Sequence, residues 1–107
     1  MSNLDEELQK RLEEKIEEKI KDYFNNNIEN INYFLISNHS YTVWLGNINL
    51  SSAIQQCQLY SKNHNMQYRL AATNSNEGDY FKHPQNNKIF WLLEYNINNI
   101  KAITDLN

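Results

Sequence analysis

The apolar run at residues 88–97 (KIFWLLEYNI) constrains the fold of this chain more than any other segment. Alternate side chains of a strand point to opposite faces, and apolar residues occupy both faces of this run. One face would carry Ile89, Trp91, Leu93, Tyr95 and Ile97, and the other Phe90 and Leu92. A strand that is apolar on both sides is typical of the centre of a sheet. We therefore predict a central strand whose Trp91 face meets the helices and whose Phe90 face needs separate cover.

Residues 4–24 have the clearest helical pattern in the sequence. Apolar side chains recur at every fourth residue, namely Leu4, Leu8, Leu12, Ile16, Ile20 and Phe24. A helix has about 3.6 residues per turn, so this row drifts slowly around the helix axis. The pattern predicts an amphipathic helix that crosses a sheet or another helix obliquely, with its charged face in solvent. The alternative is an exposed helix that binds a second copy or a partner.

The other elements follow from shorter local patterns. We predict strands at 31–36 and 41–45, a helix at 50–63, and strands at 68–73 and 88–97. Asn49 is the expected cap of the helix, and a capping box of Ser52 and Gln55 is the alternative. Residues 74–87 are expected to be irregular, and a weak tail at 98–107 could form a turn of helix at Ile100 and Ile103. The result is one α+β domain, residues 1–107, of order α-β-β-α-β-β with helices packed on a small, mainly antiparallel sheet. The connection through residues 50–63 is compatible with a crossover between parallel strands.

Charge and composition limit the partners of this chain. The net charge is −3, and the first 24 residues, with eight acidic and five basic side chains, account for all of it. The neutral remainder shows no basic stripe for a phosphate backbone. The abundance of Asn and Ile suggests an AT-rich genome, such as that of a phage, a mobile element or an intracellular pathogen. A single cysteine and a charged N-terminal region without a signal-peptide core favour the cytoplasm of the cell or of a host.

No motif in the sequence predicts a metal site or a cofactor. The candidate ligands His39, His64, His83 and Cys57 show no ligand spacing. Cys57 falls on the apolar stripe of the second helix, so we expect a core residue and not a nucleophile. The two isolated glycines form no phosphate-binding loop.

One carboxylate could carry chemistry. Glu94 lies inside the predicted central strand, and Arg69 is its best cationic partner. We favour a structural ion pair over a catalytic role, because structural ion pairs also perturb pKa values. A small enzyme built around Glu94, Arg69 and His83 stays an alternative.

The sequence favours a non-catalytic protein-binding module, an inhibitor or adaptor that acts by steric occlusion or charge complementarity. Aromatic side chains dominate binding hot spots, and long loops often carry binding residues. The expected binding surface combines the exposed stripe of the N-terminal helix with residues 74–87 and Trp44. Its expected binding residues are Trp44, Tyr80, Phe81, Lys82, His83, Arg69, Glu13 and Glu17. A homodimer through the N-terminal helix is a further possibility. The alternative is single-stranded nucleic-acid binding by a patch of Tyr41, Trp44, Tyr80 and Phe81 near Lys82, His83 and Lys88.

Overall fold

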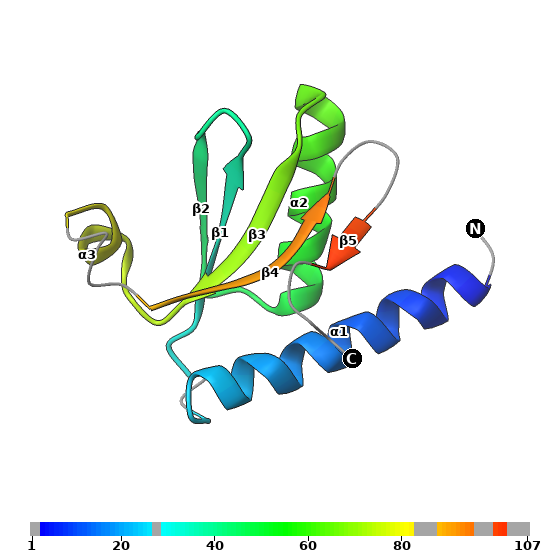
Figure 1. Cartoon of the computed structure of the whole chain (residues 1–107), viewed down its shortest axis with the longest axis horizontal. Coiled ribbons are helices and arrows are strands. Elements are labelled where there is room, and N and C mark those ends of the chain that lie inside the picture. Colours follow the sequence, from blue (N-terminus) through cyan, green and yellow to red (C-terminus); the bar gives the residue numbers. More distant parts are fainter. Residues whose placement is uncertain (1–2, 27–28, 83–87, 96–99, 103–107) are drawn as a thin grey trace.

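Three helices and five strands make up the part of the chain that the computed structural model describes, residues 3–26, 29–82, 88–95 and 100–102 (Figure 1). In chain order they are α1 (Asn3–Tyr23), β1 (Asn32–Ser37), β2 (Thr42–Gly46), α2 (Leu50–His64), β3 (Tyr68–Thr73), α3 (Glu77–Lys82), β4 (Ile89–Tyr95) and β5 (Ile100–Ala102). The helices α1 and α2 and the first four strands lie within a few residues of the predicted positions. The helix α3 and the strand β5 were not predicted. The expected turn of helix at Ile100 is wrong, because Ile100–Ala102 pair with β4 as a strand, and Ile103 lies outside the described residues.

The strands form one sheet in the order β2-β1-β3-β4-β5, and every neighbouring pair is antiparallel. The predicted α+β fold with helices packed on an antiparallel sheet is therefore confirmed. The strand β4 is internal, as predicted, but β3 occupies the middle of the sheet. Strands β2 and β3 run in the same direction because both pair with β1, which lies between them. The α2 connection therefore joins parallel strands that are not neighbours.

Asparagine side chains and their tolerance of left-handed backbone define the ends of both long helices. After α1, Asn25 and Asn26 have φ values of 54° and 65°, and the Asn26 N–H donates to the Lys21 carbonyl over 2.7 Å. The Asn49 side chain caps α2 by accepting the Ser52 N–H at 2.8 Å, as predicted. Asn65, with φ 52°, ends the same helix. Asparagine adopts such angles more readily than most residues, which explains these positions.

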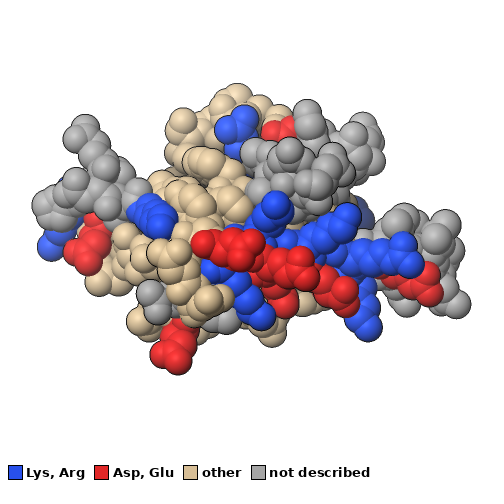
Figure 2. Space-filling view, turned by 60° about the horizontal axis from the view of Figure 1, so that its bottom comes forward, with Lys and Arg blue, Asp and Glu red and all other residues tan. Residues whose placement is uncertain are grey.

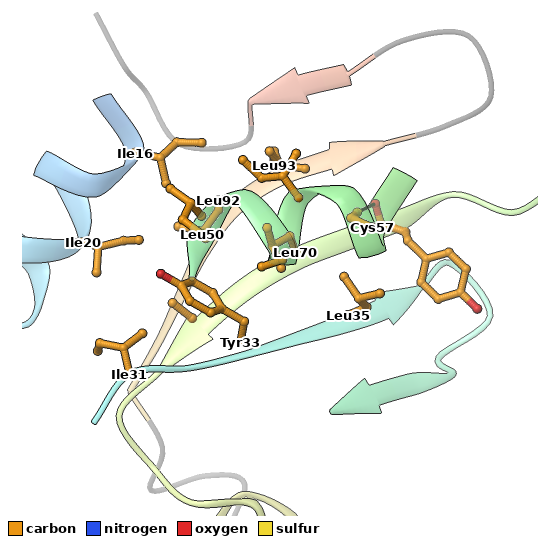
Figure 3. Packing of buried hydrophobic residues seen from close by; sticks show 14 of the residues in the cluster. Ile16, Ile20, Ile31, Tyr33, Leu35, Leu50, Cys57, Leu70, Leu92 and Leu93 are labelled. Atoms are coloured by element: carbon orange, nitrogen blue, oxygen red, sulfur yellow. Dashed lines mark hydrogen bonds between the residues drawn. The ribbon is translucent and has the colours of Figure 1, made fainter. Parts of the chain in front are cut away.

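The main core lies between α1, α2 and one face of the sheet, which we call the helix face (Figure 3). Figure 3 shows Ile16 and Ile20 of α1 pointing toward Leu50 of α2 and toward the strands. The sheet contributes alternate residues to this core: Val43 and Leu45, Tyr33 and Leu35, and Tyr68, Leu70 and Ala72. The second half of α1 thus packs on the core, as the amphipathic interpretation predicted, and α1 runs across the strand direction (Figure 1).

A β-bulge in β4 overturns the predicted faces of this strand. Leu70 pairs with Leu93, but Ala71 pairs with Trp91, so Leu92 is an extra residue. An extra residue reverses the alternation of side chains beyond it. Phe90 therefore packs on the main core and stacks on Tyr23 of α1, with ring centroids 4.6 Å apart. The prediction that Trp91 would meet the helices together with Leu93 was wrong, because the bulge separates them.

Candidate functional site

The sheet has a second face, opposite α1 and α2, whose side chains form a separate aromatic group. Phe34 of β1, Trp44 of β2 and Trp91 of β4 lie in one cross-strand row, with Ala71 of β3 between Phe34 and Trp91. Tyr80 and Phe81 of α3 pack on this row. We call Phe34, Trp44, Trp91, Tyr80 and Phe81 the aromatic face.

The geometry of the aromatic face ranges from a buried base to an exposed rim. Phe34 is fully buried, and its ring lies 4.7 Å from the Tyr80 ring and 6.0 Å from the Trp44 ring. Trp44 in turn lies 5.7 Å from Tyr80 and 6.4 Å from Phe81. Trp44, Tyr80 and Trp91 are partly buried, whereas Phe81 is 53% exposed. Sequence reasoning identified Trp44, Tyr80 and Phe81 correctly as neighbours, but it missed Phe34 and Trp91.

The short helix α3 positions Tyr80 and Phe81. Its first turn is fixed by Asn76, whose side-chain oxygen accepts the Asp79 N–H at 2.8 Å. Glu77 and Asp79 in the first turn and Lys82 in the last complement the helix dipole. The helix carries no buried residue, so it depends on the contacts of its aromatic side chains with the sheet. This segment was predicted to be irregular, because six residues are too few for a helical period to emerge.

The neighbouring cross-strand row carries the predicted ion pair. Arg69 of β3 is in register with Glu94 of β4 and with Ile36 of β1, which pairs in turn with Thr42 of β2. The Arg69 Nε lies 3.6 Å from a Glu94 carboxylate oxygen. Arg69 is 53% exposed and Glu94 20%. His83, the third member of the proposed enzyme centre, lies outside the described residues.

The expected binding residues do not form one surface. Glu13 and Glu17 belong to α1, which packs on the helix face, whereas Trp44, Arg69, Tyr80 and Phe81 lie on or beside the aromatic face. Acidic and basic side chains are interleaved along α1 (Figure 2). The idea that one surface combines α1 with the segment after residue 74 is therefore wrong, because the sheet separates them.

The cation Lys88 also lies on the α1 side of the sheet. Its Nζ is 4.8 Å from the ring centroid of Tyr23 and 5.9 Å from that of Phe24. Such cation–π contacts hold the ammonium against α1. Lys88 is thus not part of the aromatic and basic patch that the sequence suggested, although Lys82 is exposed on α3.

A groove of about 310 Å³ separates α1 from the start of α2. Glu17 and Lys21 line it from α1, Asn49 and Leu50 from α2, and Tyr33 from β1. Burial, and to a smaller extent the Glu17 carboxylate, raises the pKa of the Tyr33 hydroxyl to about 12. The phenol therefore keeps its proton over the physiological range. The groove combines one carboxylate, one ammonium and apolar walls, which is an ordinary composition for a surface cleft.

Cys57 is a core residue, as the sequence predicted. It is fully buried in α2, and its thiol lies 3.6 Å from the Tyr68 carbonyl oxygen. Burial raises the pKa of this thiol to about 12. A protonated, inaccessible thiol is a poor nucleophile and a poor metal ligand.

Asparagine side chains gather at the end of the sheet next to α3, around a polar crevice of about 600 Å³. Asn47 donates to the Ile31 carbonyl at 2.6 Å, and Asn32 donates to the Ser75 carbonyl at 3.0 Å. These amides tie neighbouring connections to the ends of strands. The crevice is therefore explained by chain connections, and it requires no ligand.

Within the described ranges, no three His, Cys, Asp or Glu side chains lie close enough together to hold a metal ion. None of the helices there combines the length and the apolar character needed to cross a membrane. Comparisons with protein-family models, with curated proteins and with solved structures found no match to this chain. The interpretation of its function therefore depends on the geometry of the aromatic face.

Proposed function

We propose that this protein is a non-catalytic module that binds a protein partner through its aromatic face. The observation that carries the proposal is the half-exposed Phe81 ring, which lies beside Trp44 and Tyr80 above the buried Phe34. When a partner covers a large apolar side chain that is exposed but held in place, removing its surface from water lowers the free energy of the complex.

The surroundings of this ring resemble the centre of a protein interface. Trp, Tyr and Arg are enriched among hot-spot residues, and each occurs here, as Trp44, Tyr80 and Arg69. The fully buried Phe34 gives the aromatic rings a fixed base, so little conformational entropy is lost on binding. The partner would contribute an apolar side chain to the centre and polar groups opposite Arg69 and Glu94 at the rim.

Single-stranded nucleic acid is the weaker candidate because cations are scarce around the aromatic face. Lys82 and Arg69 lie on this side, Arg69 is paired with Glu94, and the strand register places Lys101 of β5 opposite Glu94 in the same row. Glu77 and Asp79 are exposed on α3 itself. A surface that tracks a phosphate backbone needs a surplus of positive charge. The contact between Arg69 and Glu94 is explained as a surface ion pair, so it does not support catalysis by these two residues.

The proposed setting is the cytoplasm, where a lone, buried cysteine stays reduced. There the module would act as an inhibitor or adaptor that occludes part of its partner. An origin in a phage, a mobile element or an intracellular pathogen fits the composition of the chain.

The test is partner capture by wild-type protein, by Phe81→Ala and by Leu59→Ala. Phe81 and Leu59 are 53% and 49% exposed, and Leu59 lies on α2, so the two substitutions remove similar exposed apolar groups from different surfaces. We expect Phe81→Ala to weaken capture of a specific protein by about tenfold or more, which is the effect of losing one hot-spot side chain. Leu59→Ala should capture it normally.

Competition with untagged wild-type protein defines which captured proteins are specific. The proposal is wrong if Phe81→Ala retains every competed partner at wild-type level while Leu59→Ala loses one. A competed nucleic acid, released by moderate salt, would instead support the alternative.

A further inference from the structure

The two edges of the sheet differ in how well they are protected from pairing with another strand. The edge strand β5 has three residues. Short length is a common device against strand addition. The opposite edge strand, β2, has five residues, TVWLG, with no charge and no proline. No described strand pairs with its outer side.

The alternation of hydrogen bonds identifies the backbone groups that β2 presents at this edge. The Ser37 N–H donates to the Tyr41 carbonyl over 2.8 Å, which fixes Ser37 and Tyr41 as a hydrogen-bonded position of the hairpin. Hydrogen-bonded and non-hydrogen-bonded pairs alternate along antiparallel strands. Leu35 and Val43 are therefore the next hydrogen-bonded pair. Thr42 and Trp44 alternate with Tyr41 and Val43. Their N–H and C=O groups therefore point outward from this edge, away from β1.

The sequence around β2 adds no electrostatic protection. Between Glu29 and Lys62 the chain contains no Asp, Glu, Lys or Arg. The residues that flank β2 include Tyr41 and Ile48, which are 60% and 36% exposed. Like charges that face each other across strands oppose pairing, and this edge has none to offer.

We propose that β2 pairs antiparallel with β2 of a second copy of this chain, around a two-fold axis at Val43. With this register Thr42 lies opposite Trp44 of the other copy, and each pair exchanges two N–H···O=C bonds. All the outward groups of Thr42 and Trp44 are then satisfied by four backbone hydrogen bonds. A register centred on Trp44 forms only one such pair between regular strand residues, because Thr42 would then meet Gly46, beyond the bulge at Leu45.

A second copy fits this edge better than a charged peptide because the edge is uncharged and matches itself under two-fold symmetry. On the helix face Val43 would meet its own equivalent, and Tyr41 would meet Leu45. On the other face Trp44 would lie over Thr42, so the aromatic faces of both copies would become continuous. The dimer does not require the proposed partner binding, since its hydrogen bonds come from the backbone of β2 and Phe81 takes no part in the strand pair.

The first test measures mass and amide exchange against concentration. Edge pairing buries a small area, so we expect a weak dimer that becomes detectable by sedimentation at about 0.1 mM protein. In parallel, amide exchange of Thr42 and Trp44 should slow as concentration rises, while exchange of Val43, already bonded to β1, should not change. A chain that stays monomeric at about 1 mM, or exchange that is independent of concentration, overturns the proposal.

Two substitutions at one position separate the backbone from the side chain. Thr42→Pro removes an outward N–H and no hydrogen bond of the hairpin, and edge strands accept proline at such positions. We expect it to raise the dimer dissociation constant by about tenfold or more, because two of the four hydrogen bonds are lost. The control Thr42→Ala keeps the N–H and should dimerise normally. Equal dissociation constants for the two variants would rule out pairing through this edge.

A charge pair tests the register without relying on proline. Val43→Lys and Val43→Asp each place like charges opposite each other at the two-fold axis, so each protein alone should stay monomeric. Mixed together, they should form a heterodimer, because Lys then faces Asp. Dimerisation of either variant alone at wild-type strength excludes an axis at Val43. If the variants prove unfolded by circular dichroism, the exchange pattern of the wild-type protein decides.

Discussion

Both faces of the sheet bury apolar side chains, mainly aliphatic on the helix face and aromatic on the other, but the two faces are covered to different extents. On the helix face, α1 and α2 cover Leu35, Leu70 and Leu93, all of which are fully buried. On the aromatic face, Phe34 is fully buried against Tyr80, Trp44 and Trp91, but Phe81 of the six-residue helix α3 is half exposed. One face thus forms the stable core. The other keeps apolar surface in contact with water, which is the property expected of a binding surface.

Substitution of Leu70 in β3 should have the largest effect on the free energy of unfolding. Leu70 is fully buried on the helix face, and Leu70→Ala should lower the free energy of unfolding by about 2–5 kcal/mol, through lost transfer energy and a cavity. Urea denaturation followed by circular dichroism measures this. A loss below about 1 kcal/mol would mean that the helix face repacks easily and that the contrast is overstated.

Burial of Cys57 on the helix face should also make the free energy of unfolding decrease at alkaline pH. The pKa of Cys57 is raised from 9.0 to about 12, so the folded protein retains a proton that the unfolded chain loses above pH 9. The contribution of this thiol to the free energy of unfolding is then fully present below pH 9. It falls as pH rises toward 12, by up to about 1.4 kcal/mol per pH unit.

Comparison with Cys57→Ala isolates the contribution of the thiol, since Tyr33, whose pKa is also about 12, titrates in both proteins. Denaturation at several alkaline pH values should show a shallower slope for Cys57→Ala. Equal slopes would show that the thiol is accessible in the folded state. Slow labelling of the native thiol by an alkylating reagent provides an independent check.

The aromatic face should respond least to loss of its ion pair. Arg69→Gln removes a half-exposed contact with Glu94, and surface pairs contribute about 0–1 kcal/mol. The same denaturation assay should therefore give a curve close to wild type. A loss above about 2 kcal/mol would indicate a structural network and would weaken the assignment of Arg69 to a binding rim.

Local sequence patterns predicted much of the fold and about half of the site. The alternation in β2 placed Trp44 opposite the Val43 and Leu45 side, and the stripe on α2 placed Cys57 in the core, because both signals repeat over short distances. Phe34 was missed, since the apolar run of β1 has no alternation that distinguishes its faces. The aromatic residues of α3 were noticed as binding candidates, but six residues gave no helical period.

The sequence by itself determined where most helices and strands lie, that Asn49 caps α2 and that no long apolar helix is present among them. These are local properties, decided by side-chain period and by turn residues. The tertiary structure decided which side chains meet. The bulge at Leu92 depends on pairing with β3, a strand about twenty residues away, and it sends Phe90 to the core and Trp91 to the aromatic face. For β4, the sequence determined an internal apolar strand, and only pairing could assign its faces, because one extra residue reverses the faces of the residues that precede it.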